Sequence, residues 1–123
     1  PLRPEIVAVC QRLHRHLPTA LLTNNILEWR TAWRSRVDTE GLFHTVVDSC
    51  EVGMRKPEPA IYAEVERRLE LPAEALLFID DLGMNLKPAR QRGWQTLKYV
   101  DTAEVLGVLN AVARHCEAPH LPT

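Results

Sequence analysis

The hydrophobic positions along the chain predict short buried strands alternating with amphipathic helices. Apolar residues that recur three and four apart form one face of a helix, whereas a short apolar run between turn-forming residues is typical of a buried strand. Helices are predicted over residues 4–17, 27–37, 60–69 and 85–92 and from residue 102 onward, with Asn85 and Thr102 as expected caps. Strands are predicted over residues 19–23, 45–48, 76–79 and 94–100. This alternation implies an α/β fold, with a Rossmann-like parallel sheet, right-handed crossovers and helices on both faces.

The predicted elements belong to one domain over residues 1–116, followed by a tail over residues 117–123. The chain has 123 residues, of which 46% are hydrophobic and 25% charged, and its formal net charge is −1. This composition excludes an intrinsically disordered chain and lacks the basic excess of a dedicated nucleic-acid binder. No stretch approaches the ~20 apolar residues that a membrane helix requires. We therefore expect neither nucleic acid nor a membrane as a partner.

The three cysteines give a modest indication of the cellular compartment. Cys10, Cys50 and Cys116 lie far apart in the sequence, and none belongs to a CxxC pair. An odd number of separated cysteines argues against a disulfide framework. The expected setting is therefore reducing and cytoplasmic.

Polar residues follow three of the predicted strands, and in open parallel sheets ligands bind outside these carboxyl ends. The residues are Thr23 with Asn24, Asp48 with Ser49 and then Lys56, and Asp80 with Asp81. Two adjacent carboxylates are costly unless a cation or a lysine offsets their charge. Mg²⁺ usually binds one or two carboxylates together with a phosphate, and lysine and threonine side chains are suitable phosphate partners. The set predicts phosphoryl chemistry assisted by a divalent cation.

Each of these residues also has an ordinary structural explanation. Asp81 alone could cap a turn, Thr23 could be a loop hydroxyl, and Lys56 could be solvated. Their joint placement after three strands favours a functional site. Response-regulator receiver domains also combine an acidic pair, a Thr and a Lys around Mg²⁺, but there the acidic pair comes first. Here the acidic pair comes last, which excludes that family.

The order of the motifs resembles that of the haloacid dehalogenase-like hydrolase superfamily. Residues 21–25 (LLTNN) resemble its second motif, residues 52–62 (VGMRKPEPAIY) its third, and residues 78–90 (FIDDLGMNLKPAR) its fourth. The residues around Lys56 and Asp80 are most similar to the phosphatase-like N-terminal domain of soluble epoxide hydrolase and its bacterial relatives. The resemblance covers roughly residues 5–110.

The resemblance implies a Mg²⁺-dependent phosphatase that hydrolyses small phosphate monoesters through an aspartyl-phosphate. Thr23 and Asn24 are expected to bind the transferring phosphoryl group. Lys56 is expected to bind the substrate as well, because in the family this lysine offsets negative charge on the nucleophile and the phosphate. The catalytic set implied in this chain is Lys56, Thr23 and Asp80.

The resemblance also implies which residues contact the Mg²⁺ ion. Asp81 is the expected direct ligand. Asp80 is expected to pair with Lys56 or with metal-bound water, and Asn85 to contact the water shell of the metal. Dehalogenases of the same superfamily lack this acidic pair, so its presence favours the phosphatase interpretation over a 2-haloacid dehalogenase.

One part of the family pattern is not found in the sequence. The first motif, Asp-x-Asp at the end of an apolar strand, supplies the nucleophile and should precede Thr23, but residues 1–20 contain no Asp. The cap that selects substrate is not found either. In the family the first strand lies between the strands that end here at Thr23 and Asp80. We therefore expect a C-terminal part of a longer coding sequence, inactive and marginally stable without an N-terminal segment of the same domain. A non-catalytic binding or regulatory module of the same fold is the alternative.

Overall fold

Strands and helices alternate along the part of the chain that the computed structural model describes, which is residues 3–24 and 42–118. The helices are α1 (Pro4–His14), α3 (Ser49–Val52), α4 (Pro59–Leu69), α5 (Gly83–Gln91) and α6 (Thr102–Glu117), with a 3₁₀ turn η2 (Ala73–Ala75). The strands are β1 (Ala20–Thr23), β2 (Thr45–Asp48), β3 (Leu77–Asp80) and β4 (Gln95–Lys98). The helix predicted over residues 27–37 lies outside the described residues.

The described strands form two separate parallel pairs. β1 pairs with β2, and Thr23 lies opposite Asp48 at their carboxyl ends. β3 pairs with β4, and Asp80 lies opposite Lys98. Within the described residues β1 and β3 are not hydrogen-bonded neighbours, so the sheet is divided between them. The predicted α/β class is confirmed, but its parallel sheet is present as two halves.

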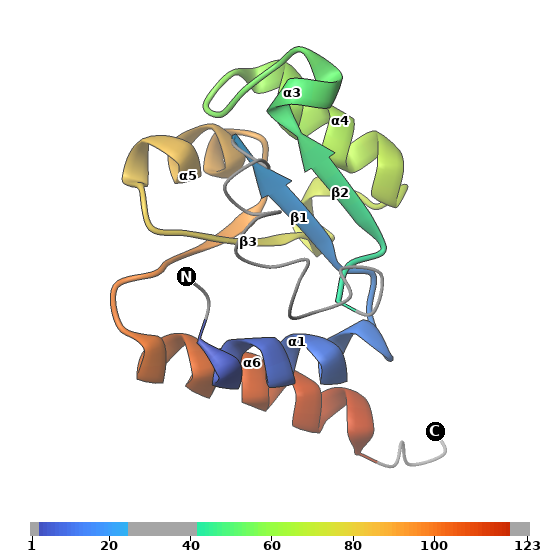
Figure 1. Ribbon diagram of the computed structural model, residues 1–123, viewed down its shortest axis with the longest axis vertical. Helices are drawn as coiled ribbons and strands as arrows, with labels where there is room; N and C mark the ends of the chain where they lie inside the picture. The colour runs from blue at the N-terminus through green and yellow to red at the C-terminus, as the bar shows by residue number, and fades with distance from the viewer. Residues whose placement is uncertain (1–2, 25–41, 119–123) are drawn as a thin grey trace.

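Helices cover the strands on both sides (Figure 1). Helices α1 and α6 lie side by side on one side, and α3 and α4 lie on the other. Each side has its own apolar cluster, because the amphipathic helices bury one face against the strands. The cluster under α4 and α5 contains Val47, Ile61, Tyr62, Val65, Leu76, Ala89 and Trp94. The cluster between α1 and α6 contains Ile6, Val9, Leu13, Val105, Leu109 and Ala113.

Polar bonds reinforce the contact between α1 and α6. Arg12 on α1 donates from Nη1 to Oδ1 of Asn110 over 3.0 Å and from Nη2 to Oε1 of Glu117 over 2.6 Å. Both acceptors lie on α6, so the first and last described helices are joined by side chains as well as by apolar packing.

The structure corrects both predicted helix caps. Helix α5 begins at Gly83 with Leu82 as its N-cap residue, so Asn85 lies inside the helix. Helix α6 is capped by Asp101, whose Oδ1 accepts from the N–H of Ala103 over 2.9 Å. The Thr102 hydroxyl instead forms a 2.8 Å hydrogen bond with that of Tyr99. In both cases the predicted cap residue has another hydrogen-bond partner.

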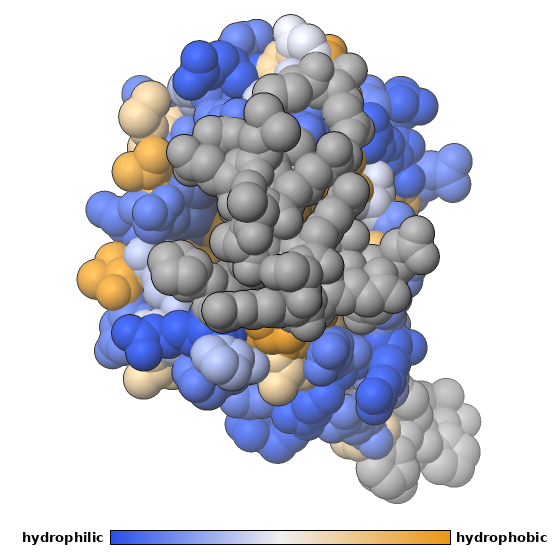
Figure 2. Space-filling view, viewed as in Figure 1, coloured by the Kyte–Doolittle hydropathy of each residue, from blue (hydrophilic) through white to orange (hydrophobic). Residues whose placement is uncertain are grey.

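The described surface is mixed in character. On the face drawn in Figure 2 the coloured residues are mostly hydrophilic, with apolar spots among them. The exposed large apolar residues are Leu17, Leu77, Leu82, Met84 and Val100. Among the described helices, none combines the length and the apolar character needed to cross a bilayer.

Candidate functional site

A lysine and an aspartate form a shielded ion pair where the strands end. Nζ of Lys56 lies 2.7 Å from Oδ2 of Asp80, and the two side chains are only 11% and 6% exposed. The ammonium also lies 5.8 Å from the centroid of the Phe78 ring. Because Lys56 follows the β1–β2 half of the fold and Asp80 ends β3, this pair links the two halves of the sheet.

The Asp80 carboxylate is fully engaged by neighbouring donors. Its Oδ1 accepts from the N–H of Leu82 over 2.9 Å, and the Nδ2 atom of Asn85 lies 3.3 Å from both carboxylate oxygens. Burial raises the pKa of Asp80, but the hydrogen bonds from Lys56 and Leu82 and the positive charge of Lys56 outweigh burial. The pKa of Asp80 therefore lies below its usual value, and the carboxylate is ionised at neutral pH.

The neighbouring carboxylate has a different environment. Asp81 directly follows Asp80 but is exposed at the end of β3. Mg²⁺ prefers oxygen ligands and is usually bound by one or two carboxylates together with substrate phosphate and water. No cluster of three or more His, Cys, Asp or Glu side chains suited to a metal ion occurs among the described residues. Of the residues predicted to contact the metal, Asp81 is therefore the exposed donor, and a Mg²⁺ ion bound to it would need further oxygen ligands.

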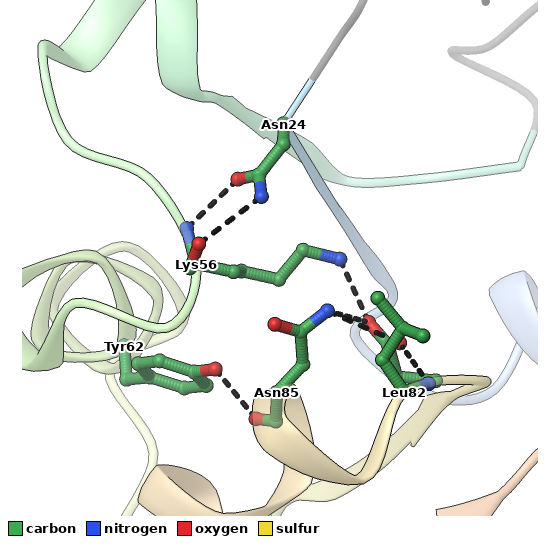
Figure 3. Close-up of polar contacts among 6 residues, drawn as sticks. Asn24, Lys56, Tyr62, Leu82 and Asn85 are labelled. Carbon is green, nitrogen blue, oxygen red and sulfur yellow. Dashed lines mark hydrogen bonds and ion pairs between the residues drawn. The ribbon is translucent and has the colours of Figure 1, made fainter.

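Asn24 contacts the backbone of Lys56 rather than its side chain (Figure 3). Oδ1 of Asn24 accepts from the Lys56 N–H over 2.8 Å, and Nδ2 of Asn24 donates to the Lys56 carbonyl over 3.2 Å. The Ser49 hydroxyl donates to the carbonyl of Asn24 over 2.7 Å. The residues that follow β1, β2 and the turn before α4 are therefore joined in one network.

Thr23 directly precedes Asn24 in the chain. It is the last residue of β1 and is buried, with 6% of its surface exposed. Its register partner Asp48 is 1% exposed and ends β2. The structure therefore places Thr23, the predicted phosphate-binding residue, at the carboxyl end of a strand and opposite the buried Asp48.

Tyr62 supports the other side of the site. Its phenol donates to the carbonyl of Asn85 over 2.5 Å, and the whole residue is buried. Burial, followed by the negative charge of Asp80, raises the pKa of Tyr62 to about 12. The phenol therefore stays protonated, and its bond fixes the first turn of α5, from which Asn85 reaches Asp80.

Apart from Thr23, the sequence-predicted residues divide into two groups in the structure. Lys56, Asp80, Asn85 and Asn24 are connected by hydrogen bonds, whereas Asp81 is exposed beside them. Sequence reasoning did not assign Tyr62 to the site: it is the last residue of the third motif (residues 52–62), and nothing in the sequence indicated a role for its phenol. Ser49 had a weak signal, since it follows a predicted strand directly.

Comparison with known proteins shows which family this chain resembles. The family model for haloacid dehalogenase-like hydrolase matches residues 1–93. Bifunctional epoxide hydrolase 2 of Rattus norvegicus is 35% identical over 114 residues, which are 89% of this chain and 21% of that protein. Glyceraldehyde 3-phosphate phosphatase of Methanopyrus kandleri is 38% identical over 64 residues, which are 51% of this chain and 28% of that protein. The chain therefore spans about a fifth of the length of the epoxide hydrolase relative.

A solved structure has the same fold. A HAD family enzyme of Bacteroides thetaiotaomicron, in complex with magnesium and inorganic phosphate, superposes with a TM-score of 0.74. The match covers 85% of this chain and 58% of that chain, at 23% sequence identity. At this identity the likeness shows the fold alone.

Proposed function

This chain belongs to the haloacid dehalogenase-like hydrolases, and we propose that it forms the phosphate-binding and metal-binding part of a phosphatase that hydrolyses phosphate monoesters. The observation that carries this proposal is the shielded pair of Lys56, in the turn before α4, and Asp80, at the carboxyl end of β3. A cation in a site of low exposure stabilises a transferring phosphoryl group far more than a solvated cation does. The phosphatase among the relatives supports the same reaction class.

In the proposed reaction the site residues of this chain bind the phosphoryl group or position the residues that do so. Lys56 offsets the negative charge of the phosphoryl oxygens while Asp80 keeps its ammonium in place. The hydroxyl of Thr23 and the backbone that follows it at Asn24 bind the same oxygens. Mg²⁺, when bound through Asp81, would neutralise further charge on the phosphate. These contacts strengthen as charge develops on the oxygens, which is the condition for catalysis.

The nucleophile in this proposal comes from a further strand of the same domain. An aspartate oxygen of that strand forms a bond to phosphorus while the bond from phosphorus to the substrate alcohol breaks, and a second aspartate gives the alcohol its proton. Water, deprotonated by the second aspartate, then attacks phosphorus; the bond from phosphorus to the first aspartate breaks, which releases phosphate and restores that carboxylate. The division of the sheet between β1 and β3 supports a strand placed there. The lack of any Asp in residues 1–20 supports its origin outside this chain.

The test uses an extended polypeptide, in which an apolar strand ending in Asp-x-Asp and encoded upstream precedes Pro1. We expect Mg²⁺-dependent release of phosphate from an aryl phosphate, and no halide release from a 2-haloacid. Phosphate release that a chelator abolishes and added Mg²⁺ restores supports the proposal. Halide release without metal would contradict it and favour a dehalogenase.

A non-catalytic binding module of this fold is the second candidate. The observation that favours it is again the lack of Asp upstream of Thr23. An extended polypeptide that binds phosphate and Mg²⁺ but releases no alcohol would favour this candidate. For either function we propose a cytoplasmic setting, because Cys10 and Cys116 are both free thiols.

A further inference from the structure

Lys56 is fixed at both ends by residues that come from different halves of the sheet. Its ammonium lies 2.7 Å from Asp80, which ends β3. Its backbone N–H and carbonyl are both bonded to the side chain of Asn24, which directly follows β1. Figure 3 shows the lysine extended between these two contacts. The reach of the ammonium is therefore set by where Asn24 places the backbone.

The two bonds from Asn24 define the orientation of its amide. The oxygen faces the Lys56 N–H at 2.8 Å and the nitrogen faces the Lys56 carbonyl at 3.2 Å. The opposite orientation would set two donors against each other and two acceptors against each other. A side-chain amide paired with a main-chain peptide in this way replaces the bonds that a strand neighbour would provide.

Lys56 has no regular secondary structure to fix its backbone. It lies in the turn between α3 and α4, where neither a helix nor a strand ladder pairs its peptide groups. A lysine side chain also has many rotamers, so an uncertain backbone position would be amplified at Nζ. The Ser49 hydroxyl, which donates to the Asn24 carbonyl over 2.7 Å, fixes the position of the asparagine in turn.

We propose that Asn24 is a positioning residue for Lys56, and that its side chain does not bind the substrate. We call the two hydrogen bonds from the Asn24 side chain to the Lys56 backbone the clamp. The role of Lys56 in phosphate binding rests on the proposed function, whereas the clamp does not. The inference gives the Asn24 side chain a role of its own, separate from the expected contact of this residue with the phosphoryl group.

The clamp is tested by amide hydrogen exchange in the 123-residue chain. Asn24→Ala removes both bonds, and we expect the Lys56 amide to exchange about tenfold faster or more, because one hydrogen bond of ordinary strength is lost. Asn110→Ala is the matched control, because it removes an amide that bonds to Arg12 between α1 and α6. We expect that control to leave exchange at Lys56 unchanged. Equal exchange at Lys56 in wild type and Asn24→Ala would overturn the inference.

A second measurement needs no variant. The coupling across a hydrogen bond between the Lys56 nitrogen and the Asn24 side-chain carbonyl carbon is measurable by NMR in the unsubstituted chain. Detecting this coupling supports the clamp, and its absence in a spectrum that shows couplings within β1 and β2 would overturn it. This measurement remains decisive if Asn24→Ala does not fold.

The effect of Asn24→Ala on catalysis is measured in the extended polypeptide. A residue that acts through Lys56 is expected to affect kcat, because small displacements of a catalytic group cost up to about 100-fold in rate. We expect Asn24→Ala to lower kcat by about tenfold or more while KM changes less than about twofold. A raised KM with unchanged kcat would show direct substrate binding and overturn the inference. An inactive extended polypeptide would overturn the proposed function, and hydrogen exchange would still decide the role of Asn24.

Discussion

Nζ of Lys56 lies 2.7 Å from Oδ2 of Asp80, and this contact joins two pairs of strands that share no strand-to-strand hydrogen bond within the described residues. Both side chains are nearly shielded from water. A charge in such an environment is costly without its partner, because the partner replaces the lost solvation. The pair is therefore expected to contribute to stability as well as to phosphate binding.

Replacing Lys56 by Met tests the contribution of this pair to stability. The buried carboxylate of Asp80 would keep its bonds from Leu82 and Asn85 but lose its countercharge. We expect the free energy of unfolding to fall by about 3 kcal/mol, at the lower end of the range for broken buried pairs. Urea denaturation measures the change. Lys87→Met, at an exposed position of α5, serves as the control and should stay within ~0.5 kcal/mol of wild type. A similar small change for Lys56→Met would contradict the prediction.

Glu66 is expected to make stability depend on acid pH. Its carboxylate accepts two hydrogen bonds from Arg92 and one from Trp94 Nε1. The hydrogen bonds from Arg92 lower the pKa of Glu66 and outweigh burial, which raises it. The hydrogen bond from Trp94 lowers it further, so the pKa lies below its ordinary 4.5. A lowered folded-state pKa means that the stabilisation is complete above pH 4.5 and is lost as the pH falls through the folded-state pKa.

The matching experiment compares wild type with Glu66→Gln across this pH range. The variant keeps an acceptor for Trp94 but has no titrating group at this position. We expect a constant stability difference from pH 7 to pH 5 that shrinks once the pH falls below 4.5. Urea titrations at each pH measure the difference in the free energy of unfolding between the two proteins. The titration of the other carboxylates contributes equally to both and cancels in this difference. A difference that is the same at pH 3 and pH 7 would be incompatible with this interpretation.

The phenol of Tyr62 is expected to stabilise the start of α5. Tyr62→Phe removes the 2.5 Å bond to the Asn85 carbonyl and leaves that acceptor in a buried site. The carbonyl keeps its bond within the helix, so we expect the loss of one ordinary hydrogen bond, about 0.5–1.5 kcal/mol. Tyr99→Phe is the control, because Tyr99 is only partly buried and bonds to a hydroxyl that can bind water instead. Thermal or urea unfolding compares the two, and equal losses would count against a special role for Tyr62.

Asp81 is expected to be the carboxylate that binds Mg²⁺. It is exposed, whereas both oxygens of Asp80 already accept hydrogen bonds. We expect Asp81→Asn to weaken Mg²⁺ binding by the extended polypeptide at least about tenfold, since even substitutions behind metal ligands cost that much. Titration calorimetry with MgCl₂ measures the affinity. Asp101→Asn, at the cap of α6, is the matched control, and equal affinities for both variants would show that Asp81 is not a ligand.

Local sequence patterns predicted the described strands and the longer described helices, but not the short α3 and η2 or the contacts between elements. The strand predicted over residues 45–48 was found with these bounds, because its apolar run ends at a polar residue. The predicted caps of α5 and α6 were wrong because the side chains of Asn85 and Thr102 form hydrogen bonds with residues that only the folded chain brings next to them. The amide clamp from Asn24 to Lys56 spans 32 residues and uses a side chain against a backbone, so no spacing rule indicates it. The division of the sheet followed from the family's strand order and not from hydrophobicity.

The central claim is that this chain provides the binding half of a phosphatase site and needs a nucleophile from a further strand. The most direct measurement is the release of phosphate from an aryl phosphate with Mg²⁺, by the 123-residue chain and by the extended polypeptide under the same conditions. We predict no turnover by the chain alone, turnover by the extended polypeptide, and loss of that turnover when the first Asp of its Asp-x-Asp motif becomes Asn. Turnover by the 123-residue chain alone that Asp81→Asn abolishes would contradict the claim.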